Sequence, residues 1–381
     1  MSSIYLDHAA STPVHPEVAE RMIHILTTQY GNASSVHQYG RSAKKIVNGA
    51  RDSIAARLGC LPEELVFTSG GTESDNLAIF GVVESLGLKG KHIITSAIEH
   101  HAVLHTCEEL ESQGCQVTYV PVDAYGRVAV EDVEAAMQDN TVLVTIMYGN
   151  NEVGTIQPIR EIGELCRSRG ILFHTDAVQA LGAVPIVCHE LPVDLWSFSS
   201  HKINGPQGIG ALVVRSGIGL KARLFGGLQE KKRRAGTENM AGIAGFAAAV
   251  ELTVSQAEAK RAGLEELRSS LIAALRREVG EEAFVINGHP DHYLPHILNI
   301  SFPDVGTETM LMNLDMEGIA AASGSACTSG SLEISHVLQA MKLPDDVLRS
   351  AVRFSFGLGN TTQEMEYTAQ KIGTILNRLR K

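Results

Sequence analysis

A lysine and an aspartate stand at the ends of two short apolar runs in the middle of the chain. Lys202 closes the segment Trp196–Lys202, in which apolar residues give way to hydroxyls and a histidine, and Asp176 follows the run Ile171–Phe173. A lysine can form a Schiff base with pyridoxal phosphate (PLP), and a carboxylate can keep the pyridine nitrogen protonated so that the ring accepts electrons. Most lysines are solvated surface residues, but the pairing with Asp176 predicts a PLP site.

A glycine pair earlier in the chain has the pattern of a phosphate-binding turn. The apolar run Leu65–Phe67 is followed by Gly70 and Gly71, and Thr72 and Ser74 then open a helical stretch. Free backbone amides and the helix dipole bind anions at a helix N-terminus, and glycine lets the backbone approach closely. The same residues would also suit an ordinary helix N-cap.

Other nucleotide-binding patterns are less well supported. No Walker lysine follows this turn. Residues 217–222 fit the GxGxxA dinucleotide pattern, with Glu238 near the distance expected of a ribose-binding acid, but the basic run 231–234 occupies the place of the second strand. A nucleotide-binding protein that uses the glycines but not Lys202 stays as an alternative.

Short apolar runs alternate with helical patterns between about residues 60 and 215. The expected strands are Leu65–Thr68, His92–Ser96, Gln116–Val120, Val142–Met147, Ile171–His174, Leu195–Ser199 and Ala211–Val214. The expected helices are Asp75–Leu86, Ala102–Ser112, Val130–Met137 and Ile159–Arg169. This alternation predicts an α/β fold with a mostly parallel seven-stranded sheet and helices on both faces. Ligands bind beyond the carboxyl ends of such strands, where Asp176 and Lys202 fall.

A second, smaller unit is expected at the C-terminus. After a long helical stretch over residues 242–279, the strand pattern restarts with Phe284–Ile286 and His296–Phe302. A length of 381 residues is consistent with about two domains. We expect a large PLP-binding domain over residues 16–254 and a small α/β domain built from residues 1–15 and 255–381.

Composition and charge exclude several classes of protein. A hydrophobic content of 44% predicts a folded core, and a net charge of −11 argues against direct nucleic-acid binding. The six cysteines (60, 107, 115, 166, 188 and 327) form no CxxC pair, which favours a reducing cytosol. Neither a signal peptide nor an apolar run long enough to span a membrane is evident. We therefore expect a cytoplasmic protein with no membrane partner.

Together the motifs resemble the class V branch of fold type I PLP enzymes, and within it the cysteine desulfurases of the NifS/IscS type. The resemblance covers nearly the whole chain and rests on Tyr5–Ala10, Thr68–Asn76, Glu99–His100, Asn150–Gly154, Asp176 with Gln179, Ser199–Lys202, Arg233–Asn239, Ser323–Gly330 and Val352–Ser355. The last three segments are the specific ones. Tyr148-Gly149 and Leu228 depart from the commonest pattern, but neither removes a catalytic group.

The resemblance implies a role for each candidate residue. Lys202 carries PLP and removes the substrate α-proton, Asp176 pairs with the pyridine N–H, and Gln179 reaches the phenolic oxygen of the ring. His100 stacks on the ring and handles protons. The remaining cofactor and substrate contacts are implied for Gly71, Thr72, Ser199 and His201 at the phosphate, Thr237 at the phosphate from a second subunit, Asn151 beside cofactor and substrate, and Arg353 at the substrate carboxylate.

Cys327 distinguishes a desulfurase from an aminotransferase. It lies among small and polar residues that are unsuited to a core, so we expect an exposed, mobile loop. The resemblance implies that its thiolate takes sulfur from L-cysteine, which releases L-alanine and leaves a persulfide. The persulfide sulfur would then pass to an acceptor protein in iron–sulfur cluster assembly, tRNA thiolation or another sulfur-modification pathway. The expected assembly is a homodimer with shared active sites.

Another type of PLP enzyme remains an open alternative at this point, whereas a metal site is not expected. An aminotransferase or a selenocysteine lyase would share every feature except the need for Cys327. His101 and His105 have the spacing of a metal-binding pair, but catalytic zinc sites need three protein ligands and the sequence shows no third. We expect no metal.

Overall fold

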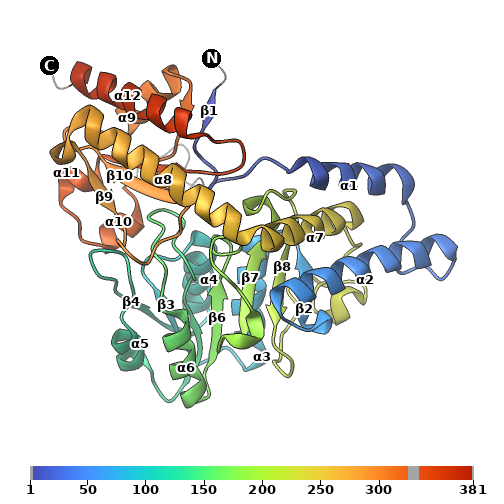
Figure 1. Ribbon diagram of the computed structural model, residues 1–381. Helices are drawn as coiled ribbons and strands as arrows, with labels where there is room; N and C mark the ends of the chain where they lie inside the picture. The colour runs from blue at the N-terminus through green and yellow to red at the C-terminus, as the bar shows by residue number, and fades with distance from the viewer. Residues whose placement is uncertain (1–2, 325–333, 380–381) are drawn as a thin grey trace.

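The computed structural model describes residues 3–324 and 334–379 of the 381-residue chain. Cys327 therefore lies outside the described residues. The chain folds into a large sheet flanked by helices, with a smaller unit that packs across one end of it (Figure 1). Both termini lie on the smaller unit (Figure 1).

The large sheet has seven strands in the order β2-β8-β7-β6-β5-β3-β4. The strands are β2 (Leu65–Thr68), β3 (His92–Ser96), β4 (Gln116–Val120), β5 (Thr141–Thr145), β6 (Leu172–Asp176), β7 (Leu195–Ser199) and β8 (Gly210–Val214). Only β8 runs antiparallel to its neighbours, and the other adjacent pairs are parallel. The predicted α/β fold with a mostly parallel seven-stranded sheet is confirmed.

Helices cover both faces of this sheet because successive strand residues point to opposite sides. On β7, for example, Leu195 belongs to one apolar cluster and Trp196 to the cluster on the other face. One face is covered by α3 (Gly71–Ser85) and α4 (His101–Ser112). The helices on the other face are α2 (Gln38–Leu58), α5 (Val130–Ala136), α6 (Ile159–Arg169) and α7 (Met240–Ser255).

The smaller unit has its own apolar core. Its strands are β9 (Val285–Asn287), β10 (Ile297–Ser301) and β12 (Ala351–Ser355) in an antiparallel sheet, with β1 (Ile4–Tyr5) parallel to β11 (Ile319–Ala320). Its helices are α8 (Ala257–Val279), α9 (Thr307–Met316), α10 (His336–Ala340), α11 (Asp345–Leu348) and α12 (Thr362–Leu379). The pairing of the N-terminal strand with the C-terminal region supports the domain division at residues 16–254, which we keep as a proposal.

The helical stretch predicted over residues 242–279 is confirmed, but it consists of two helices. It divides at Gln256 into α7 and α8, whose axes differ by 75°. The bend lets α7 pack on the large sheet while α8 packs on the small one. Among the described residues no single helix is long and apolar enough to cross a bilayer, although α7 and α8 taken together meet the length and composition requirement across their bend.

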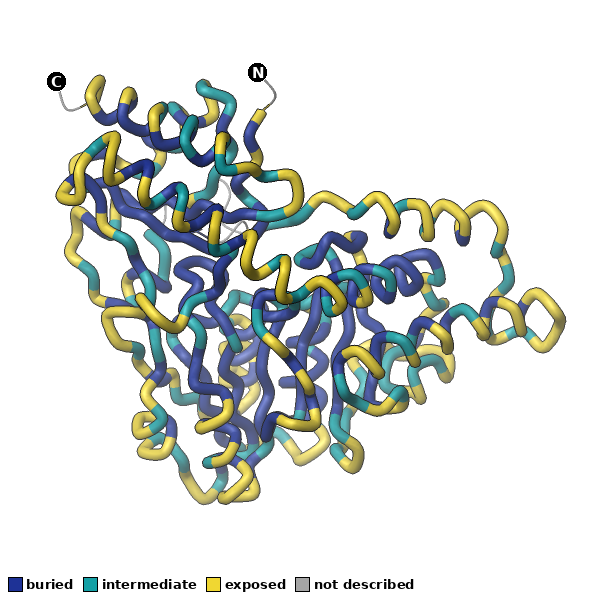
Figure 2. The backbone as a smooth tube through the Cα atoms, in the orientation of Figure 1, coloured by how far each residue is buried: buried dark blue, intermediate teal, exposed yellow. Residues whose placement is uncertain are grey.

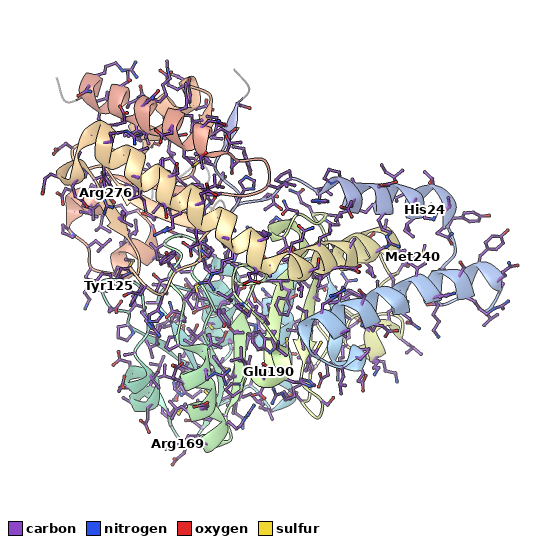
Figure 3. The ribbon with its side chains drawn as sticks, in the orientation of Figure 1. His24, Tyr125, Arg169, Glu190, Met240 and Arg276 are labelled. Carbon is purple, nitrogen blue, oxygen red and sulfur yellow. The ribbon has the colours of Figure 1, made fainter. Side chains whose placement is uncertain are left out.

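An N-terminal arm extends away from the sheet. Helix α1 (Pro16–Thr28) and the start of α2 project to one side (Figure 1), and most of α1 is exposed (Figure 2). Only one side of α1 packs on the body, where Ile25 contacts Ala241 and Ala244 of α7. Figure 3 marks His24 on α1 and Met240 at the start of α7.

Candidate active site

The carboxyl ends of the parallel strands meet at the edge of the sheet that faces the small unit. A cavity of about 200 Å³ lies there. Its lining includes all but two of the predicted site residues, namely Gly71, Thr72, His100, Asn151, Asp176, Gln179, Ser199, His201, Lys202 and Arg353. Thr237 is exposed and is not part of the lining, and Cys327 lies outside the described residues. The roles assigned to these residues stay predictions.

Lys202 lies in the short turn that follows β7. Its Nζ donates to the carbonyl oxygens of Ala9 at 2.5 Å and Ala10 at 2.8 Å. These carbonyls belong to the N-terminal segment, which pairs with the small unit near Asp7 and Ser355. The sequence contained the Ala9-Ala10 pair but gave no reason to place it at the lysine, because the contact joins residues more than 190 positions apart.

Asp176 ends β6 and is 7% exposed. Burial raises the pKa of its carboxyl to about 6, although the Val178 N–H, which donates at 2.9 Å, and the charge of Lys202 both act in the opposite direction. A buried carboxylate of this kind would be stabilised by a protonated ring nitrogen beside it.

A second buried carboxyl that the sequence analysis missed lies beside Asp176. Asp75, in the second turn of α3, also lines the cavity and is 1% exposed. Burial and the charge of Asp176 raise the pKa of Asp75 well above its ordinary value. Its Oδ1 lies 3.6 Å from Nε2 of His174, a ring that also bonds Thr145 and Ser197. The two hydrogen bonds of His174 join β6 to Thr145 on β5 and to Ser197 on β7.

The expected phosphate site is built by the turn between β2 and α3 and by the residues after β7. A Cβ on Gly71 would lie 2.7 Å from Cγ2 of Val178, so no larger residue fits without movement. Ser199 Oγ is buried and has no hydrogen-bond partner among the described residues. His201 bonds Ser11 through Nδ1 at 3.2 Å. Burial, followed by the charge of Lys202, lowers the pKa of His201 to about 4.

His100 caps α4 and faces the same cavity. Its Nδ1 accepts a hydrogen bond from Ala102 N at 3.1 Å, which leaves the ring proton on Nε2 when the ring is neutral. Burial, then the charge of Lys202, lowers the pKa of His100 to about 4. The ring is therefore neutral at pH 7 and can both stack and donate one hydrogen bond.

Gln179 has a partner that the sequence did not indicate. Its Nε2 donates to Ala9 O at 2.9 Å, and its Oε1 lies 3.1 Å from Nε2 of His296. Burial lowers the pKa of His296 to about 3, so its ring is neutral. A neutral ring that donates to Oε1 fixes the amide with Nε2 as the donor.

Arg353 is a buried guanidinium on β12, at 1% exposure. Its NH2 forms an ion pair with Asp7 at 2.9 Å, and its NH1 donates to Asn151 O at 2.8 Å. Guanidinium has five N–H donors, so further donors remain for a substrate carboxylate. The sequence analysis assigned no role to Asp7, which orients this side chain.

These residues fit PLP. The Ser199 hydroxyl, which has no partner within residues 3–324 and 334–379, and the close backbone approach at Gly71 suit a phosphate. The raised pKa of Asp176 suits a cationic ring nitrogen. Lys202 lines the same cavity and can form the Schiff base with the aldehyde of PLP.

A third histidine lies beside the His101 and His105 pair. The ring of His336, at the start of α10, has its centroid 4.8 Å from that of His101, and the His101 and His105 centroids are 5.0 Å apart. Within residues 3–324 and 334–379, however, no group of three or more His, Cys, Asp or Glu side chains has the geometry to hold a metal ion.

Known proteins resemble this chain over nearly its whole length. The family model for class-V aminotransferases matches residues 4–368. A putative cysteine desulfurase IscS 1 of Bacillus subtilis is 50% identical over the full length of both chains. The structure of a NifS-like protein superposes with a TM-score of 0.92 at 36% identity, covering 99% of this chain and 100% of the other. A structure described as SspA in complex with cysteine gives a TM-score of 0.80 at 36% identity, covering 93% of this chain and 99% of the other.

Proposed function

Because the chain belongs to the class-V aminotransferase family, and within it to the cysteine desulfurases, we propose that it is a PLP-dependent enzyme that converts L-cysteine to L-alanine. The sulfur is transferred to Cys327. The observation that carries this proposal is the single cavity that contains Lys202, Asp176 and Arg353. Related structures support the substrate, since one of them holds cysteine.

Each side chain of the cavity has a distinct task. Bound PLP supplies an electron sink for the electron pair that remains when the substrate α-proton leaves. Lys202 would hold the cofactor and, once released from it, would take the substrate α-proton. Asp176 would keep the ring nitrogen protonated. Arg353 would orient the substrate carboxylate, and the neutral ring of His100 would stack on the cofactor and donate from Nε2.

The sulfur step balances without an external oxidant. The Cys327 thiolate attacks the sulfur of L-cysteine, so that a sulfur–sulfur bond forms and the bond between Cβ and sulfur breaks. The electron pair of the broken bond stays with the carbon fragment, which takes up protons and leaves as L-alanine. Cys327 retains the sulfur as a persulfide. The outer sulfur atom then passes to an acceptor thiol or scaffold.

The assembly proposed is a homodimer. Large apolar side chains are exposed on the N-terminal arm and on the loop before the basic run, including Ile23, Leu26, Tyr30, Val36 and Phe225. Monomers rarely leave such side chains uncovered together, and a symmetric interface would cover both copies. Thr237 follows the same loop, which supports its placement at the phosphate of the partner subunit.

The proposed compartment is the cytoplasm, and the proposed acceptors are iron–sulfur scaffold or thiolation proteins. The five cysteines that the structure describes carry free thiols, which suits a reducing compartment.

Cys327→Ser tests the assignment. This variant should bind PLP as the parent does and lose persulfide formation from L-cysteine, because only the nucleophile is removed. Mass spectrometry of the protein and quantification of alanine provide the measurements. Alanine production at the parental rate would refute the role of Cys327, and a 2-oxo acid product would favour an aminotransferase.

Complementation tests the shared site. Inactive Lys202→Ala and Thr237→Ala subunits, mixed under conditions that form heterodimers, should recover part of the activity. A fully active monomer by light scattering would contradict the homodimer.

A further inference from the structure

Glu152 is a buried carboxylate that the chemistry above does not use. It directly follows Asn151, and it is 1% exposed. Its backbone is held on both sides, because its N–H donates to Asn150 Oδ1 at 2.8 Å and its C=O accepts from Asn299 Nδ2 at 3.2 Å. A buried carboxylate is costly without polar partners. The groups that contact it therefore show which segments of the chain it joins.

Both described ends of the segment that carries Cys327 meet at this carboxylate. On the C-terminal side, Ser335 Oγ donates to Glu152 Oε2, and the same hydroxyl accepts from Leu338 N at 3.2 Å as the N-cap of α10. On the N-terminal side, a Cβ on Gly324 would lie 2.9 Å from Oε2 and 3.3 Å from Cδ of Glu152. A side chain at this position would push against the carboxylate and displace it, because the main chain passes directly beside it.

The same region is joined to the substrate site. Ala322, two residues before Gly324, exchanges backbone hydrogen bonds of 3.1 and 2.7 Å with Arg353. Arg353 also donates to the carbonyl oxygen of Asn151, the residue before Glu152. The position of the carboxylate is thus fixed relative to the guanidinium that receives the substrate.

We propose that Glu152 is a positioning residue whose carboxylate holds residues 324 and 335 together and so sets where the Cys327 segment meets the substrate. This inference rests on the proposed function, since it concerns the delivery of the Cys327 thiol. It requires no contact between Glu152 and substrate or cofactor. Its effect should therefore be confined to the sulfur-transfer step.

Two rates in the PLP-loaded enzyme separate this role from a general one. Single-turnover persulfide formation on Cys327 needs the segment in place, whereas exchange of the α-proton of L-alanine in deuterium oxide needs Lys202 but not Cys327. Glu152→Ala should slow persulfide formation by about tenfold or more, because a displacement of about 1 Å suffices for such losses. Its α-proton exchange should stay within about twofold of the parent.

Control variants match the chemistry of each change. Glu64→Ala removes a carboxylate that is equally buried, with bonds to His189 and Ser216, far along the chain from the segment. It should leave the ratio of the two rates unchanged. Glu152→Gln keeps an acceptor for Ser335 and should retain most of the persulfide rate.

A steric test is independent of the charge. Gly324→Ala should slow persulfide formation, and Glu152→Ala combined with Gly324→Ala should be no slower than Glu152→Ala alone, because the oxygen that the new Cβ meets is gone. Gly49→Ala is the matched control, since a Cβ at Gly49 meets nothing within 4 Å.

Three outcomes would overturn the inference. Glu152→Ala with a parental persulfide rate on Cys327 overturns the role of Glu152 and leaves the proposed function intact. Equal slowing of both rates, or equal slowing in Glu64→Ala, shows a general loss of structure and also overturns it. Parent enzyme that carries its sulfur on another cysteine overturns both the inference and the assignment of Cys327.

Discussion

Replacing Asp176 by asparagine should stabilise the cofactor-free protein and inactivate the PLP-loaded enzyme. The carboxylate ends β6 at 7% exposure and accepts one hydrogen bond from Val178 N at 2.9 Å. Asparagine has the same size and can accept that bond through Oδ1, but it carries no charge. The substitution therefore removes the cost of a buried charge and leaves the packing in place.

The size of the effect follows from the pKa of Asp176. Burial raises this pKa to about 6, against an ordinary value of 3.8. The folded state thus binds a proton at a higher pH than the unfolded state, so its stability falls as pH rises from about 4 to 6 and is constant above. The two pKa values differ by about two pH units, which corresponds to ~3 kcal/mol of free energy of unfolding as an upper bound.

Urea denaturation of the cofactor-free protein at fixed protein concentration measures this gain. Asp176→Asn should exceed the parent by up to ~3 kcal/mol at pH 7.5 and by almost nothing near pH 4. Asp123→Asn is the control, since Asp123 is an exposed turn residue that accepts from Tyr125 N and Arg127 N. A gain of equal size at both pH values, or a loss at pH 7.5, would refute the reasoning.

The PLP-loaded enzyme should respond in the opposite direction. A neutral amide cannot stabilise a protonated ring nitrogen, so Asp176→Asn should lose most of its turnover of L-cysteine. Turnover at the parental rate would mean that another acid, such as Asp75, pairs with the ring.

Three further predictions concern the same cavity. Lys202→Ala should retain PLP only weakly, with no borohydride-stable bond at residue 202 and no α-proton exchange, and a covalent adduct elsewhere would contradict the assignment. Gly71→Ala should weaken PLP binding, measured by fluorescence titration, by about 1–3 kcal/mol, because its Cβ would lie 2.7 Å from Val178 Cγ2 and force the turn or Val178 to move. Gly49→Ala should leave PLP binding unchanged. Arg353→Lys should raise the KM for L-cysteine more than it lowers kcat. The reason is that a lysine lacks the planar guanidinium that can bind Asp7 and a substrate carboxylate at the same time. An unchanged KM would exclude Arg353 from substrate binding.

The large sheet and the residue types of the site could be predicted from the order of the amino acids. Strands such as Ala211–Val214 were predictable because apolar side chains on both faces give a short continuous hydrophobic run. Asp176 and Lys202 were placed at strand ends because each follows a short apolar segment. The break at Gln256 was not predictable, since apolar periodicity continues on both sides of it and only packing on two separate sheets requires the bend.

The distant groups that surround those residues could be identified only from the folded molecule. The carbonyls of Ala9 and Ala10 at Lys202, His296 at Gln179, Asp7 at Arg353 and Glu152 at Gly324 are contacts between segments far apart in the chain. Local propensity contains no information about such pairs, because their geometry is set by how the small unit packs across the carboxyl edge of the large sheet. The pKa of Asp176 likewise depends on burial, a property of the packed molecule, so the sequence could name the acid but not its titration.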